Sequence, residues 1–362
     1  MNISLKKGNI ITILSCEKDL TIAKARFVDG ELRVVNHDLL TGPISLGDKV
    51  LVNTTATDLG LGSGGEGFVA INLDHPEVAT YGGGHIMKLR YTPFQFSVAS
   101  IEEESSDFHE GLKDFEDIDG LPVVVGELHS QLYACVIGIK SKRPDAKIVY
   151  MMTDGAALPI AHSRTVKELK TRELISETIT VGHAFGGDIE AVNIYSGLQA
   201  AKVVSGADIV VAIMGPGVVG TGTTLGFSGI EQAQLVNAVI SLGGRAVAIP
   251  RITFNDKRKR HYGLSHHTFT ALGIATLGRA TIAFPVLKGE RLKTLMEQAR
   301  SAGLLEKHDI EEHDATNILD ELRGVGSGAT TMGRGIDEEP EFFMAAGASG
   351  ICAGRMLEDN GR

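Results

Sequence analysis

The first 98 residues alternate apolar and polar positions over short stretches. These stretches, separated by turn residues, occupy positions 10–14, 20–27, 31–35 and 49–53. Alternation places apolar side chains on one face of a strand, and the Asp29-Gly30 pair is typical of a hairpin turn. Many short strands with little helix predict a small β-rich, barrel-like domain over residues 1–98.

From residue 121 the pattern changes to apolar runs that alternate with segments of helical spacing. The apolar runs lie at 122–127, 147–152, 178–181, 209–214, 246–249 and 281–286. The segments of helical spacing lie at 130–140, 165–174, 189–204 and 231–242. This order predicts an α/β domain over 121–362, with a doubly wound, mainly parallel sheet of about six strands and a helical C-terminal region.

Residues 99–120 differ in composition from both flanking regions. Nine of the twenty residues at 101–120 are Asp or Glu, and few are large and apolar. Such a segment has little to bury, so we expect an exposed acidic connector that marks the domain boundary.

Charge and cysteine content exclude several classes of protein. The formal net charge of −10 argues against a nucleic-acid-binding protein, which usually carries a basic face. Cys16, Cys135 and Cys352 are far apart and form no paired motif, as expected in a reducing compartment. The N-terminus lacks a signal-peptide pattern, and no apolar run is long enough to span a bilayer. These features predict a cytoplasmic protein without a membrane partner.

Polar residues follow the first three predicted strands of the α/β domain. In an open parallel sheet, ligands bind beyond the carboxyl ends of the strands, so these residues are expected to share one edge. The catalytic candidates are His129, Asp154 and His183, which suit acid–base chemistry or metal binding. The structural alternative is that they are packed or surface residues.

A glycine-rich loop at 215–229 follows the fourth strand and contains six glycines and three threonines. Such a loop can direct backbone N–H groups at an anion, although it matches neither a P-loop nor a dinucleotide fingerprint. The spacing of Ser228 and Glu231 fits a capping box, so a purely structural turn is the alternative. The candidate ligand-binding residues in this loop are Gly215, Gly217, Gly220, Thr221, Gly222, Thr223 and Thr224.

Three further residues are candidates for binding an anionic ligand. Arg164 and Arg251 could pair with a carboxylate or phosphate, or with a neighbouring acidic side chain. Asp188 is either a ligand-binding residue or the N-cap of the helix that follows it.

The segment 251–267 carries a basic run at 257–260 and two adjacent histidines. A basic run usually forms a solvated face, but its position on the ligand edge makes a phosphate or carboxylate clamp the alternative. His266 and His267 are expected to point in different directions on a helix, which disfavours a shared metal. The sequence specifies neither a metal nor another cofactor.

Two glycine-rich segments of the N-terminal domain, 53–65 and 81–85, are also conspicuous. They are predicted to be hairpin loops. The alternative is that they reach across and close over the site of the α/β domain.

Several segments together give the chain a family resemblance. They are 53–65, 84–93, 181–197, 215–232, 265–272 and 332–335. With these segments the chain resembles a bacterial family known only as domain of unknown function 3866. The resemblance covers nearly the whole chain but implies no mechanism and no catalytic residues.

Three functions are compatible with these features. The first is an enzyme acting on a small anionic metabolite, phosphorylated or nucleotide-like, at the carboxyl edge of the strands. The second is a non-catalytic metabolite-binding or regulatory protein that uses the same pocket. The third is an assembly protein that forms homo-oligomers through the Ala- and Gly-rich stretch 342–356.

Overall fold

The computed structural model describes residues 2–62, 64–79, 83–115, 117–324 and 329–359. The chain forms two compact units: Met1–Gly83 with Leu89–Ser97, and Gly84–Lys88 with Val98–Arg362. Two short strands, β6 (Ile86–Lys88) and β7 (Phe96–Val98), lie where the chain passes between the units. Segment 81–85 lies partly outside the described residues.

The N-terminal unit contains a closed five-stranded barrel, as predicted. The strands pair in the order β1-β2-β3-β5-β4 and back to β1, and every pair except β3–β5 is antiparallel. This is the Greek-key arrangement of OB-fold barrels. Small aliphatic side chains such as Ala23, Val34 and Val50 fill its core. The elements are β1 (Leu5–Glu17), β2 (Leu20–Phe27), β3 (Gly30–Asn36), α1 (Asp38–Thr41), β4 (Lys49–Asn53), α2 (Thr55–Asp58) and β5 (Glu66–Asn72).

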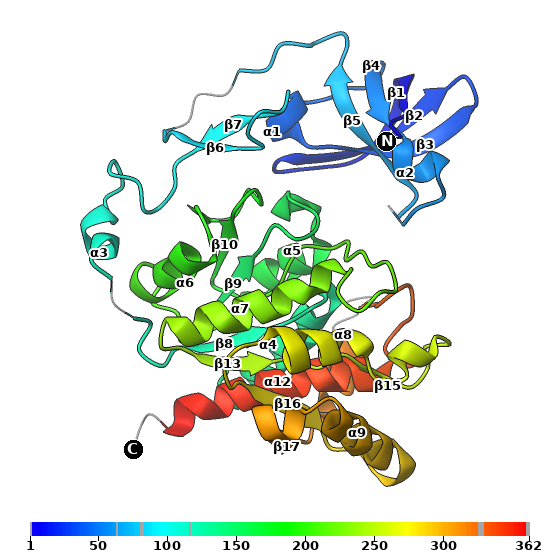
Figure 1. Cartoon of the computed structure of the whole chain (residues 1–362). Helices are drawn as coiled ribbons and strands as arrows, with labels where there is room; N and C mark the ends of the chain where they lie inside the picture. Colours follow the sequence, from blue (N-terminus) through cyan, green and yellow to red (C-terminus); the bar gives the residue numbers. More distant parts are fainter. Residues whose placement is uncertain (1, 63, 80–82, 116, 325–328, 360–362) are drawn as a thin grey trace. The chain divides into compact units, whose positions relative to one another are not determined.

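An eight-stranded, fully parallel sheet forms the centre of the second unit (Figure 1). Its order is β11-β10-β9-β12-β8-β13-β16-β17. All six predicted apolar runs form strands of this sheet, so the predicted α/β class is confirmed. The strands are β8 (Pro122–Val125), β9 (Ile148–Met152), β10 (Glu177–Val181), β11 (Ile189–Ala191), β12 (Ile209–Ala212), β13 (Arg245–Ala248), β16 (Thr281–Pro285) and β17 (Asp309–His313).

Helices cover both faces of this sheet. They form two groups, and the helices of each group pack on one another. One group comprises α4 (Leu132–Lys142), α5 (Arg164–Thr171), α11 (Thr316–Gly324) and α12 (Pro340–Asp359). The other comprises α3 (His109–Lys113), α6 (Ile194–Val203) and α7 (Glu231–Ser241). Two more helices, α9 (Gly289–Ser301) and α10 (Leu304–Lys307), connect the last two strands. In the part of the chain that the structure describes, no helix is both long enough and apolar enough to cross a membrane.

The helix predicted at 189–204 begins later than expected. Residues 189–191 form the edge strand β11, and α6 starts at Ile194. Its N-cap is Asn193, whose side-chain oxygen accepts hydrogen bonds from the backbone N–H groups of Tyr195 and Ser196. The alternative that Asp188 caps this helix is therefore wrong.

The acidic segment after residue 98 belongs to the second unit. Glu103 is buried and accepts hydrogen bonds from the backbone N–H groups of Ser100 and His85. Ile118 and Leu121 are part of the hydrophobic core of the second unit. Burial of these anchor residues fixes a segment whose other acidic side chains are mostly exposed.

The Ala- and Gly-rich stretch 342–356 forms most of α12, which packs closely on α4. A Cβ atom at Gly350 would lie 2.0 Å from the carbonyl oxygen of Cys135, and one at Gly138 would lie 2.2 Å from that of Gly347. Glycine at these positions lets the two backbones approach directly. The stretch therefore serves as an internal packing surface, and Phe342 and Phe343 are almost fully buried.

Candidate functional site

The order in which successive strands are added to the large sheet changes direction beside β8, in the middle of the sheet. The connection after β8 leads to β9 on one side, whereas the connection after β12 leads to β13 on the other. Ligands of open α/β sheets bind in the crevice at such a reversal, beyond the carboxyl ends of the strands. The segments that follow β8, β12 and β13 therefore meet where a ligand site is expected.

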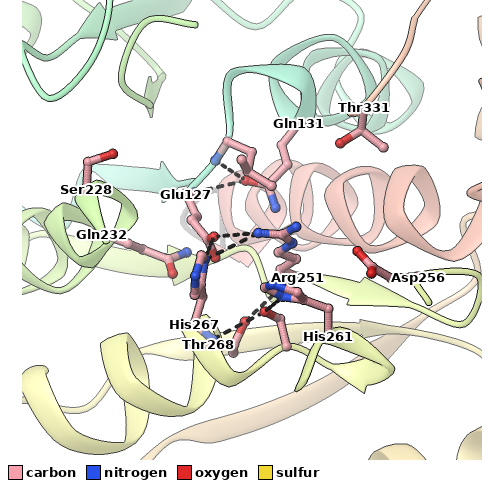
Figure 2. Close-up of polar contacts among 12 residues, drawn as sticks. Glu127, Gln131, Ser228, Gln232, Arg251, Asp256, His261, His267, Thr268 and Thr331 are labelled. Carbon is pink, nitrogen blue, oxygen red and sulfur yellow. Dashed lines mark hydrogen bonds and ion pairs between the residues drawn. The ribbon is translucent and has the colours of Figure 1, made fainter. Parts of the chain in front are cut away.

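Gln232 and Gln131 organise the backbone at these strand ends (Figure 2). The Nε2 of Gln232 donates to the carbonyl oxygens of Val125 and Ile249, both at 2.9 Å, and so bridges the ends of β8 and β13. The Oε1 of Gln131 accepts from the N–H groups of Glu127 and Leu128, also at 2.9 Å. Both glutamines are fully buried, so these bonds are shielded from water.

A buried ion pair lies at the centre of this edge. The Oε1 of Glu127 is 3.2 Å from the Nη1 of Arg251 and 2.5 Å from the Nδ1 of His267 (Figure 2). Burial raises the pKa of Glu127, but the hydrogen bond from His267 and the charge of Arg251 outweigh it, so the pKa is lowered overall. Glu127 is therefore a buried carboxylate that holds two basic side chains in place.

His267 is fixed from several sides. Its ring stacks on that of Phe227, with the centroids 3.9 Å apart and the planes 7° from parallel. Its Nδ1 faces Glu127, which leaves Nε2 on the opposite side, where a Cβ atom at Gly220 would come within 3.8 Å. The imidazole thus presents Nε2 toward the glycine-rich loop.

A cavity of about 230 Å³ opens between the glycine-rich loop and the segment 251–267. Arg258 is also paired with Asp256 at 2.6 Å, whereas Arg260 has no acidic partner among the residues that the structure describes. The lining residues are Leu128, Val218, Val219, Gly220, Gly222, Arg251, Arg258, Arg260, His261, His267 and Met332.

A second cavity of about 670 Å³ shares Arg258 and Met332 with the first. It is the more open of the two and has a mixed lining of charges. Its remaining lining residues are Asn255, Asp256, Lys257, Arg334 and Glu338.

The predicted ligand residues of the glycine-rich loop divide into two groups. Gly220 and Gly222 line the smaller cavity, together with Arg251. The hydroxyls of Thr221 and Thr223 instead bond to each other. Thr221 also donates to the carbonyl oxygen of Gly226, and Thr223 accepts from its N–H, which folds the loop back on itself. Gly215 packs against Ala157, whose carbonyl oxygen would be 2.3 Å from a Cβ. Gly217 has a φ of +114°, and Thr224 is exposed near the tip of the loop.

The predicted capping box before α7 is wrong. The hydroxyl of Ser228 accepts from the N–H of Val219 inside the loop, and Ser228 begins a 3₁₀ turn ahead of the helix. Glu231 does not cap the helix, because its Oε2 accepts a hydrogen bond of 2.6 Å from Thr153 after β9. Burial, aided by the charge of Asp154, raises the pKa of Glu231 to about 7, despite the Thr153 bond.

His129, Asp154 and His183 are not in the lining of either cavity. His129 is partly buried, with Nδ1 3.2 Å from the Met214 carbonyl and Nε2 2.6 Å from the hydroxyl of Ser163. Burial lowers the pKa of His129 to about 4. The Oδ2 of Asp154 accepts from the backbone N–H of His183 at 3.0 Å. His129, Asp154 and His183 follow β8, β9 and β10, and their catalytic role stays a prediction.

Arg164 and Asp188 also lie outside both cavities. Arg164 is the exposed first residue of α5. Asp188 bonds the backbone N–H of Thr178 at 2.8 Å and the Nζ of Lys170 at 2.7 Å, level with the beginning of β10 rather than its carboxyl end. Neither contributes to the lining of the cavities.

The basic segment is partly a solvated face and partly a cavity wall. Lys257, Lys259 and Arg260 are exposed, and Arg258 is partly buried. Of these residues, Arg258 and Arg260 also line the smaller cavity. The expectation that adjacent histidines diverge is wrong, because the ring centroids of His266 and His267 are only 4.5 Å apart. Glu127 and His267 each follow a strand, which is a local sign of a site residue. Their contact was not predictable from this sign, because it joins residues 140 positions apart in the chain.

A search of curated proteins finds no match to this chain. The model of one protein family, described as "Protein of unknown function (DUF3866)", matches residues 33–350, which include β4, β5 and part of β3 of the barrel and nearly all of the α/β unit. The chain therefore belongs to the DUF3866 family, as its sequence resemblance predicted.

Proposed function

We propose that this protein is an enzyme that acts on a small anionic metabolite, phosphorylated or nucleotide-like, at the carboxyl edge of the sheet. The observation that carries this proposal is the smaller cavity, whose lining combines three arginines with two backbone-exposing glycines. Guanidinium groups and loop N–H groups are the donors that phosphate and carboxylate oxygens prefer.

The balance of charge favours an anion in this cavity. Glu127 offsets the charge of Arg251, and Asp256 offsets that of Arg258. Arg260 contributes a further positive charge that no described acidic side chain pairs. The net positive lining is local, because the chain as a whole carries a formal charge of −10.

The sizes of the two cavities fit a ligand with an anionic head and a polar remainder. The smaller cavity, about 230 Å³, suits a phosphate-sized group. The larger one, about 670 Å³, adjoins it at Arg258 and would receive the rest of the molecule among mixed charges. This division supports a phosphorylated metabolite rather than a free inorganic anion.

The imidazole of His267 is the group best placed for proton transfer. Glu127 orients the ring through Nδ1, and Nε2 faces the loop side of the cavity. A histidine held in this way can accept or donate a proton at a bound substrate. In this proposal, the arginines bind the anionic group and His267 acts on the adjacent bond.

A second candidate is a binding or regulatory protein that uses the same pocket. The described lining contains no hydroxyl, thiol or carboxylate side chain that could act as a nucleophile. A protein that senses an anionic metabolite needs none. The two candidates predict the same binding but differ in whether product forms.

A thermal-shift screen with phosphate, nucleotides and sugar phosphates tests the proposal, followed by product analysis of every stabilising compound. A ligand at about 100 times its Kd stabilises a protein by roughly 2.7 kcal/mol, which is a shift of several degrees. Gly220→Val should abolish the shift, because its methyl groups would project toward Phe227 and His267. Gly324→Val, where a side chain meets open space, is the matched control. Absence of any stabilising anion would contradict the proposal, and binding without product would favour the regulatory alternative.

A further inference from the structure

Three histidines converge beside the smaller cavity. They come from the 3₁₀ turn η4 (Lys259–His261) and from the short helix α8 (His266–Thr268), with β15 (Gly263–Leu264) between them. β15 pairs with β14 (Ile252–Thr253) in antiparallel orientation. One potential ligand atom from each of His261, His266 and His267 lies within 4.8 Å of the other two.

Hydrogen bonds orient two of the rings. The Nδ1 of His261 is 2.8 Å from the hydroxyl of Ser265, and the Nδ1 of His267 is 2.5 Å from Glu127. In each ring, Nε2 is therefore the nitrogen that remains for a ligand. Metal-binding histidines usually have their other nitrogen held by a carboxylate, carbonyl or water, and the Glu127–His267 pair has this form.

The third ring supplies an independent observation. The Nε2 of His266 is buried and has no hydrogen-bond partner within the described part of the chain. An unpaired buried nitrogen carries a free-energy cost, and native structures contain few of them. A metal ion bound to this nitrogen would remove the cost.

We propose that His261, His266 and His267 bind one Zn²⁺ ion through their imidazole nitrogens. Neutral imidazole suits Zn²⁺, and a tetrahedral ion with three histidine ligands keeps a fourth position for water or substrate. His261 and His267 also line the smaller cavity, so that fourth position faces the proposed anion site. A His267 that binds Zn²⁺ through Nε2 cannot also transfer a proton there, so water on the ion would take over that task. This role in turnover rests on the proposed function, whereas the binding of the ion does not.

The distances within the cluster and the charges around it are compatible with this ion. Ligand nitrogens of tetrahedral zinc lie roughly 3.4 Å apart, so the rings need to approach by about an ångström or a little more. Glu127 offsets the charge of the nearby Arg251, which would otherwise repel a cation.

A second group of ligand-type side chains makes a useful comparison. Glu311, His313 and Cys352 also bring ligand atoms within 4.8 Å of one another. Here the partners are already satisfied, because Glu311 accepts from His313 at 2.9 Å and from Cys352 at 3.5 Å. This group has no orphaned ring nitrogen among the described residues and lies at the outer edge of the sheet.

The test is metal binding by the full chain after removal of metal with a chelator. We expect about one Zn²⁺ per chain in equilibrium dialysis, and at least tenfold weaker binding in His266→Gln. His313→Gln should bind as the wild type does. Wild-type protein that binds no Zn²⁺, or equal loss in both variants, would overturn the proposal.

A spectroscopic measurement covers the case in which His266→Gln fails to fold. Co²⁺ bound to the wild type should show tetrahedral absorption bands without a thiolate charge-transfer band. A thiolate band would assign the ion to the Cys352 group and overturn the proposal. Repeating the anion screen on chelated and Zn²⁺-loaded protein separates the claims: Zn²⁺ binding without anion stabilisation contradicts only the proposed function, and anion stabilisation without Zn²⁺ binding contradicts only the metal site.

Discussion

The Glu127–Arg251 ion pair gives a quantitative prediction about the stability of the site. Glu127 is fully buried, and Arg251 is 5% exposed. Replacing Glu127 with Leu leaves the guanidinium buried without its counter-ion, and breaking such a pair costs about 3–5 kcal/mol. This is a large fraction of the roughly 5–15 kcal/mol by which domains are stable.

Removing both charges should recover much of this loss. Apolar replacement of a whole buried ion pair is often neutral or stabilising, because neither charge then has to be desolvated. The double variant Glu127→Leu with Arg251→Met should therefore be more stable than Glu127→Leu alone by at least about 2 kcal/mol. Arg300→Met, an exposed arginine of α9, controls for the loss of a surface charge.

Urea unfolding followed by helical circular dichroism measures this difference. The signal reports mainly the α/β unit, because the described helices of the barrel unit have only four residues each. A loss of less than about 1 kcal/mol in Glu127→Leu would contradict this prediction, as would a double variant no more stable than the single one. Either result would mean that water or local rearrangement already compensates the buried charge.

Two further predictions concern Glu231 and the α4–α12 contact. The pKa of Glu231 in the folded chain, about 7, lies above its usual 4.5, so its contribution to stability is complete below pH 4.5 and is lost as the pH rises through 7. Glu231→Gln should thus gain stability relative to wild type between pH 5 and 8, by on the order of 3 kcal/mol, in urea titrations at several pH values; a constant difference would contradict this. Gly350→Ala should destabilise the chain by roughly 1–3 kcal/mol in the same assay, because its Cβ would lie 2.0 Å from the Cys135 carbonyl, whereas Gly324→Ala should change stability little.

The sequence predicted the interior of the fold better than its edges. The six predicted strands are short apolar runs, and both faces of such strands are covered by helices. The two strands that were missed, β11 and β17, lie at the ends of the sheet. β17 has the sequence DIEEH and is largely exposed, so it lacks the apolar signal of a central strand.

Tertiary contacts explain the errors at the site. Ser228 and Glu231 have the spacing of a capping box, but their side chains bond to Val219 and Thr153 instead. A local motif cannot reveal a competing partner that is 78 residues away, as Thr153 is from Glu231. Similarly, the close rings of His266 and His267 depend on Glu127 and Phe227, which come from two other loops.

Calorimetric titration of inorganic phosphate and pyrophosphate measures anion binding in the smaller cavity itself. The comparison uses the wild type, Arg260→Gln in the cavity wall and Arg300→Gln on the exposed surface of α9, which have the same change in charge. We predict saturable binding by the wild type and Arg300→Gln, and at least tenfold weaker binding by Arg260→Gln. Equal weakening in both variants, or no binding to any of the three proteins, would contradict an anion site in the cavity between the glycine-rich loop and segment 251–267.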